Sequence, residues 1–455
     1  MIRRFTIAAL VAVVACILWA SQQSVAEQIP SAAASAAEQP ESPEAKEAAE
    51  LFKKGDHDGA LKLLKELVKK DPNLPPAQVI MARWFLQTNV PGGMRVMLEQ
   101  AVTASPDDPE VYVMMGGLAI AEGRVTEAKL LFEKADSLAA NWNGNAKRKQ
   151  SLLPQIQAGL AQACEAHEQW AEAQKHIENW VKLDPKSADA LQRFARCLFQ
   201  QKNIPGTLEK LKEASKVDPQ LLTPEAILAR WFAQSGKPKD AETWIIAALN
   251  IAPKDARTRV VAAQWAFENG RLEDAKKQAE AARRLDPKSF DAKIISGLVA
   301  YFQKDYRTAE TYFQSALNDA PNELKFAASN NLALALIEQN DEPKKAYAYD
   351  LASKNASKYQ RRADALSTYG WVLYRRGQLD DAEKVLVAVA RSGSMTADAA
   401  YYFACVLKDR GQDVAARRWL EGALRTAAPF QHREEAKALL QKLPEAKPEA
   451  KPEAK

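Results

Sequence analysis

The sequence predicts an all-α fold in which helix-turn-helix units stack into a solenoid, an α-α superhelix. Prolines recur at a step of 34 residues, and small or apolar residues recur at fixed offsets before them. A fixed period in this range is typical of a stacked repeat array. The prolines that keep the step are Pro72 and Pro106, then Pro185, Pro219, Pro253, Pro287 and Pro321.

The second helix of each unit is predicted from the residues before the proline. Small residues stand twelve positions before it: Ala173, Thr207, Ala241, Ala275 and Ala309. Such spacing places one face of a helix against a neighbour. The proline ends this helix because it lacks an N–H group and clashes with the preceding turn. A turn such as Asn269-Gly270-Arg271 separates the second helix from a first helix with its own apolar stripe.

The repeated positions resemble the tetratricopeptide repeat family. The family pattern has Gly on the first helix, then Ala, Phe and Ala on the second helix, then Pro. Two units match it well: Gly116, Ala128, Phe132 and Ala135, and Gly297, Ala309, Phe313, Ala316 and Pro321. The resemblance implies about ten to eleven helix-turn-helix repeats over roughly residues 44–428. A last helix, His432–Leu443, is expected to cap the exposed end of the stack.

The beginning of the chain predicts export. Arg3-Arg4, the apolar run Phe5–Ala20 and the small residues of Ser24-Val25-Ala26 together predict a signal peptide over residues 1–26. Two alternatives stay open, namely an uncleaved N-terminal membrane anchor and lipidation at Cys16.

The remaining boundaries follow from composition. Residues 27–43 are expected to form a flexible linker, because they offer little to bury. Residues 44–443 form the predicted repeat domain. Residues 444–455 repeat Pro-Glu-Ala-Lys and are expected to be disordered and solvated.

Two units break the repeat step, one of them by about three added residues around Asp341-Glu342-Pro343. About eleven extra residues lie near Asn141–Ser151 and carry Lys147-Arg148-Lys149. This basic insertion is an alternative surface for a partner.

Motifs for catalysis or metal binding are missing from the sequence. The net charge of +5 on 455 residues gives no support to nucleic-acid binding. None of the four histidines has a metal-ligand spacing, and no phosphate-binding loop or nucleophile turn occurs. The sequence therefore predicts a protein that is not an enzyme and that needs no cofactor. Three cysteines are predicted to be buried structural thiols: Cys164, Cys197 and Cys405.

The resemblance implies a ligand groove lined by the first helices of the units. Its positions divide into a polar set with spaced arginines and an aromatic set. The polar set is Arg83, Gln162, Arg196, Arg230 and Gln264, and the aromatic set is Tyr301, Trp371 and Tyr374, with Tyr401 beyond them. Guanidinium groups bind carboxylates, and aromatic faces supply contact area at low entropic cost. We expect these residues to hold an extended polypeptide, the alternative being that they only shield the groove.

These observations favour a non-enzymatic protein-protein interaction scaffold of the bacterial cell envelope, exported to the periplasm. The alternative is an accessory subunit of a polysaccharide synthesis or export complex, or of a secretion complex. The expected partners are proteins that bind the groove, and no nucleic acid. A membrane is expected only through an uncleaved N-terminal segment, and the aromatic stretch could also serve self-association.

Overall fold

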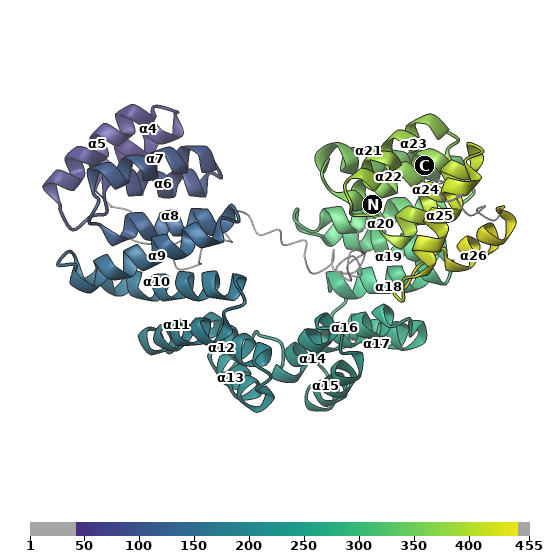
Figure 1. The fold of residues 1–455 in the computed structure, drawn as a ribbon, viewed down its shortest axis with the longest axis horizontal. Helices are drawn as coiled ribbons and strands as arrows, with labels where there is room; N and C mark the ends of the chain where they lie inside the picture. Colours follow the sequence, from purple (N-terminus) through teal and green to yellow (C-terminus); the bar gives the residue numbers. More distant parts are fainter. Residues whose placement is uncertain (1–41, 445–455) are drawn as a thin grey trace, which may run out of the picture. The chain divides into compact units, whose positions relative to one another are not determined.

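The computed structural model describes residues 42–444, which form 23 helices and no strand (Figure 1). The all-helical fold predicted from the sequence is confirmed. The predicted signal peptide, nearly all of the linker and the tail from residue 445 lie outside the described residues. None of the described helices is both long and apolar enough to cross a membrane.

The chain divides into two units, with the boundary between Pro224 and Glu225. The first unit contains α4 (Pro43–Lys53), α5 (His57–Lys70), α6 (Ala77–Gln87), α7 (Pro91–Ala104), α8 (Pro109–Ala121), α9 (Val125–Asn141), α10 (Ala146–Ala166), α11 (Trp170–Leu183), α12 (Ala188–Gln200) and α13 (Ile204–Val217).

The second unit begins at Glu225, in the first turn of α14. It contains α14 (Pro224–Gln234), α15 (Pro238–Ile251), α16 (Ala256–Glu268), α17 (Leu272–Leu285), α18 (Phe290–Phe302), α19 (Tyr306–Asp319), α20 (Lys325–Ile337), α21 (Glu342–Lys358), α22 (Ala363–Arg375), α23 (Leu379–Arg391), α24 (Ala397–Asp409), α25 (Asp413–Leu424) and α26 (Arg433–Lys442).

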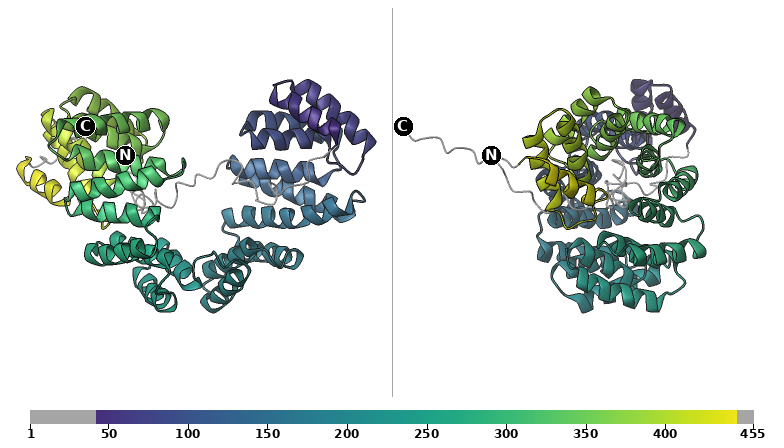
Figure 2. Two further views of the ribbon diagram at one scale, coloured as in Figure 1. Left: turned by 180° about the vertical axis from the view of Figure 1, so that it is seen from behind. Right: turned by 90° about the vertical axis from the view of Figure 1, so that its right-hand side faces the viewer.

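Within each unit, helices pair across short turns and the pairs stack. In the first unit α8 packs on α9, and α9 packs in turn on α10. In the second unit α18 packs on α19, and α19 on α20 (Figures 1 and 2). The last helix, α26, packs against α25, as expected of a helix that caps the stack.

The turn between paired helices needs a residue in the left-handed backbone conformation, with positive φ. Gly270 has φ +72° and follows α16, and its N–H donates to the carbonyl of Phe267 at 2.9 Å. Glycine adopts this conformation without steric cost and is therefore common at helix ends. In the next pair Lys304 takes the same place with φ +61°.

The glycines on the first helices leave room for a large side chain from the second helix. A Cβ atom on Gly297 of α18 would come 2.4 Å from Cε1 of Phe313 on α19. Gly116 and Gly159 leave room for Phe132 in the same way. Phe132 is fully buried. These contacts explain why Gly and Phe recur together in the repeat.

The basic insertion near Asn141–Ser151 lengthens α9 and α10 and is tied to the fold. The guanidinium of Arg148 donates to Asp108 at 2.8 Å and to Glu110 at 2.7 Å, and its side chain is 14 % exposed. It also lies over the ring of Trp142 at 4.9 Å. Arg148 therefore serves packing between α8 and α10, and is not a free basic group on the surface.

Candidate functional site

Two arginines of the predicted polar groove, Arg83 and Arg196, lie in the first unit and differ in pairing and exposure. Arg83 on α6 forms an ion pair with Glu110, whose side chain is buried and also accepts from Arg148. Arg196 on α12 is exposed. It lies near Glu165, whose pKa is raised by burial and lowered in part by Arg193 and Arg196. Arg196 is thus the more accessible of the two arginines.

Gln162 lies half-buried on α10, the helix that also carries Glu165. It belongs to the first unit, as do Arg83 and Arg196. Its position does not test whether it binds a ligand, so its role in the groove stays a prediction.

In the second unit, Arg230 and Gln264 are half-buried and each lies near a carboxylate. Arg230 on α14 lowers the pKa of Asp291, although burial raises that pKa overall. Gln264 on α16 donates to Oε1 of Glu268 at 2.9 Å. Burial is the main cause of the raised pKa of Glu268. Binding of a partner by these two residues also stays a prediction.

Five aromatic residues of the second unit lie close together and form a cluster that we call the aromatic wall. It comprises Tyr301 of α18, Trp371 and Tyr374 of α22, and Tyr401 and Tyr402 of α24. The Trp371 ring stacks on Tyr402, with centroids 4.4 Å apart, and on Tyr374, with centroids 5.3 Å apart. Its indole N–H donates to Oε1 of Glu338 at 2.7 Å. That these residues line a ligand groove stays a prediction.

The chain's own C-terminal segment lies on this wall. We define this segment as residues 429–435. The ring of His432 stacks on Tyr401 at 4.8 Å, and that of Phe430 meets Tyr401 at 6.2 Å. The side chain of Gln431 donates to the backbone carbonyl of Tyr301 at 3.0 Å. Phe430, Gln431 and His432 are all buried.

Polar contacts fix the same segment at two further points. His432 Nδ1 lies 3.4 Å from Asp398 Oδ1, and Glu435 forms an ion pair with Lys304. Sequence reasoning expected only a capping helix here. The available signal was Phe430, a large apolar residue in the short connection between Pro429 and the expected helix.

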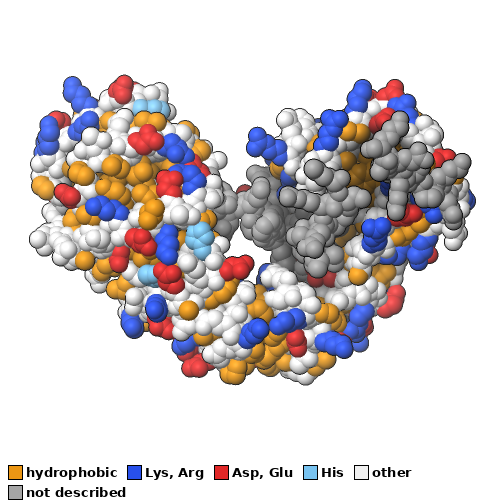
Figure 3. All heavy atoms as spheres, viewed as in Figure 1, with side chains coloured by type: hydrophobic (Ala, Val, Ile, Leu, Met, Phe, Trp, Pro, Cys, Tyr) orange, Lys and Arg blue, Asp and Glu red, His pale blue; other side chains and the backbone are white. Residues whose placement is uncertain are grey.

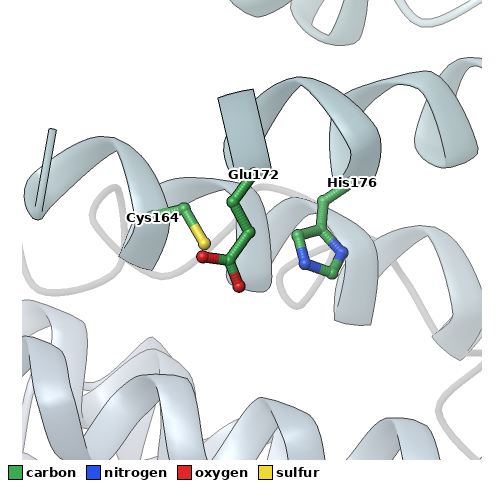
Figure 4. Close-up of side chains that lie close together, drawn as sticks. All are labelled: Cys164, Glu172 and His176. Carbon is green, nitrogen blue, oxygen red and sulfur yellow. The ribbon is translucent and has the colours of Figure 1, made fainter. Parts of the chain in front are cut away.

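A second cluster joins Cys164 of α10 to Glu172 and His176 of α11 (Figure 4). Their ligand atoms lie within 4.8 Å of one another, close enough to hold a metal ion. However, the Lys129 ammonium donates to Oε1 of Glu172 at 3.0 Å and already supplies a cation. Burial also raises the pKa of the Cys164 thiol to about 11, which disfavours the thiolate that a metal needs. We therefore assign no metal to this cluster.

Charges of both signs share the molecular surface. On the face drawn in Figure 3, Lys and Arg side chains are interspersed with Asp and Glu side chains over the helices of the first unit. Many are paired in the structure, for example Arg95 and Arg124, which both contact Glu122.

Comparison with known families matches this architecture. Models of the tetratricopeptide repeat match residues 47–74, 109–141, 154–220, 260–323 and 369–432. Together these segments cover more than half of the chain, and the chain belongs to the tetratricopeptide repeat family. Repeats of this family form protein-protein interaction scaffolds, and this is the class of function that the fold defines.

Several solved structures are similar to the chain, whereas no curated protein matches it. A tetratricopeptide repeat protein from Parabacteroides merdae is 18 % identical, with a TM-score of 0.43 over 56 % of this chain and 97 % of that one. Pseudomonas aeruginosa pilF is 18 % identical, with a TM-score of 0.35 over 47 % of this chain and 96 % of that one. Yeast Tom70 is 14 % identical, with a TM-score of 0.35 over 87 % of this chain and 94 % of that one.

Proposed function

We propose that this protein is a non-enzymatic scaffold of the bacterial cell envelope that binds an extended polypeptide on the first helices of its repeats. The observation that carries the proposal is the C-terminal segment on the aromatic wall. Residues 430–432 are a short stretch of polypeptide without helical structure, and they lie against the first helices α18, α22 and α24. The wall is thus already suited to bind a peptide.

The contacts of this segment show which chemistry the wall offers to a partner. Tyr401 supplies a ring face to His432, and the carbonyl of Tyr301 accepts a side-chain N–H from Gln431. Glu338 and Asp398 lie beside the imidazole of His432, at 3.9 Å and 3.4 Å. A partner with aromatic and hydrogen-bond-donating side chains would find groups of the same kind beside the segment, where Tyr374 is only half-buried, because rings and fixed acceptors are common anchors of protein interfaces.

The place in the envelope rests on the sequence alone. Residues 1–26 carry a basic start, then an apolar run and then small residues, which is the pattern of a signal peptide. Fractionation of a native host, followed by N-terminal sequencing, tests it. We expect a mature chain that begins at Glu27 and is found outside the cytoplasm. A chain that begins at Met1 in the cytosol would contradict this part of the proposal.

Polypeptide binding is tested by affinity capture with the mature chain as bait. Proteins captured from envelope extract are identified, and one of them is purified for direct titration. We expect Tyr374→Ala to weaken its binding, because Tyr374 is only half-buried and its ring faces Trp371. The control is Tyr347→Ala, which changes an exposed tyrosine of α21 outside the aromatic wall. Binding at the wall would be contradicted if both variants weakened partner binding equally, or if neither variant weakened it.

A further inference from the structure

A small cavity lies in the second unit beside the aromatic wall. It has a volume of about 70 Å³ and is lined by residues of α18, α20, α22 and α24 and by Gln431 of the C-terminal segment. Leu298, Phe302 and Phe326 supply apolar lining. The cavity has room for several water molecules or for the end of a side chain, and its apolar lining suits the stem of a side chain.

Three buried acceptor atoms at this cavity have no hydrogen-bond partner among the described residues. They are Asn330 Oδ1, Gln431 Oε1 and Tyr301 Oη. The three side chains are 8 %, 8 % and 5 % exposed, respectively. Buried polar groups are nearly always hydrogen-bonded, and each exception calls for a missing partner.

The hydrogen bond of the Gln431 amide fixes which of its two polar atoms lacks a partner. Its Nε2 donates to the carbonyl of Tyr301 at 3.0 Å, so exchanging its oxygen and nitrogen would place two acceptors together. Oε1 therefore stays an acceptor without a donor. The Tyr301 hydroxyl lies near that of Tyr402 and can donate its proton there, so the lone pairs of its oxygen are what remain to accept a further hydrogen bond.

The charge of the lining also favours a hydrogen-bond donor. Two carboxylates line the cavity, Asp364 and Asp398. Arg362 neutralises Asp364 and lies over the ring of Phe326 at 4.1 Å. Among the described residues, the imidazole of His432 is the ion-pairing group beside Asp398, at 3.4 Å. The site is thus rich in acceptors and carries negative charge, surrounded by aromatic rings that also attract cations.

We propose that this cavity takes the ammonium group of a lysine side chain from the bound polypeptide. An ammonium has three N–H donors and no acceptor, and each of the three oxygens can accept a hydrogen bond. The inference rests on the proposed function, because the lysine belongs to the polypeptide on the wall. The C-terminal segment is then part of the receptor, since Gln431 supplies one of the acceptors.

The test uses the full chain and two capped pentapeptides, with lysine or norleucine between alanines. Binding is measured by NMR titration. We expect the lysine peptide to bind at least about tenfold more tightly, because hydrogen bonds to a charged group are strong when buried. Asn330→Leu should remove this preference while thermal stability stays unchanged or rises, because it replaces an orphan buried acceptor with an apolar group. Asn330→Asp should increase the preference.

The control is Asn318→Leu, which changes an exposed residue of α19 outside the cavity lining. It should keep the lysine preference. The inference is overturned if both peptides bind equally, if neither binds, or if Asn330→Leu keeps the preference. If a partner from envelope extract still binds the wall in those cases, the proposed function stands and only the lysine site fails. If the lysine peptide binds but no polypeptide binds the wall, the proposed function fails instead.

Discussion

The imidazole of His432 lies stacked on the ring of Tyr401, with centroids 4.8 Å apart and planes inclined by 13°. This contact brings the end of the repeat domain back onto α24. Tyr401 also meets Trp371 at 5.9 Å, so His432 continues the aromatic wall. The face that the sequence predicts as an open ligand surface is thus covered in part by the chain itself.

Removing the two rings of the C-terminal segment should destabilise the second unit. The double variant Phe430→Ala and His432→Ala is expected to lose about 3–5 kcal/mol, because Phe430 is buried and the His432 ring is stacked. Urea unfolding followed by tryptophan fluorescence measures the loss. Lys437→Ala, which removes an exposed ion pair with Glu434 on α26, should change stability by less than about 0.5 kcal/mol. Equal effects of the two changes would contradict the packing of residues 430–432.

Gly297→Ala should crowd Phe313. The new methyl group would lie 2.4 Å from a ring carbon in a packed interior, and we expect a loss of about 1–3 kcal/mol. Gly422→Ala is the matched control on α25, where an added Cβ has no atom within 4 Å. That change should be neutral or stabilise by up to about 1 kcal/mol, as alanine does within a helix. Thermal unfolding of both variants decides, and a stable Gly297→Ala variant would refute the close contact.

Glu110→Ala should destabilise the first unit strongly. Glu110 is buried and accepts from Arg83 of α6 and Arg148 of α10, so its loss leaves two guanidinium groups without their shared carboxylate. Breaking a buried pair in this way costs about 3–5 kcal/mol. Glu127→Ala, which breaks an exposed pair with Arg124, should cost under about 1 kcal/mol. Similar losses in denaturant unfolding would argue against a structural role for the cluster.

Glu268→Gln should make the protein more stable at alkaline pH than the parent. Burial raises the pKa of Glu268 in the folded protein, and the hydrogen bond from Gln264 opposes this only in part. The folded state therefore holds the proton more tightly than the unfolded state. This contribution to stability is complete below the unfolded pKa and is lost as the pH rises through the raised pKa.

The variant lacks this loss, so its advantage should grow as the pH rises from about 4 through the raised pKa of Glu268 in the folded parent. Unfolding midpoints of parent and variant across that range measure it. Glu209→Gln changes an exposed glutamate of α13 and should show no such trend. A constant difference between Glu268→Gln and the parent at all pH values would contradict the raised pKa.

The repeat architecture could be predicted because its signals are local. Gly297 and Phe313 are set by the close contact between two neighbouring helices, and Gly270 by a left-handed turn. Each of these requirements returns once per unit, so the sequence displays it many times. The boundaries of the helices and their pairing follow from the same period.

The contacts made by the candidate site residues could not be predicted in the same way. The contact between Gln431 and Tyr301 occurs once, and it joins residues that are far apart in the sequence. The partner of Arg83 is likewise a buried glutamate on another helix, Glu110, which the periodicity does not reveal. Contacts between residues that do not repeat leave no periodic signal.

The central claim is that the aromatic wall binds polypeptide, and binding of the chain's own segment in trans tests it most directly. A labelled peptide of residues 427–443 is titrated into the full chain with Phe430→Ser and His432→Ser, after far-UV circular dichroism has confirmed that the variant is helical. We predict saturable binding at least about tenfold tighter than to the parent, whose wall is already occupied. A scrambled peptide should not bind. Equal binding of both peptides, or no binding of the native peptide, would contradict the claim.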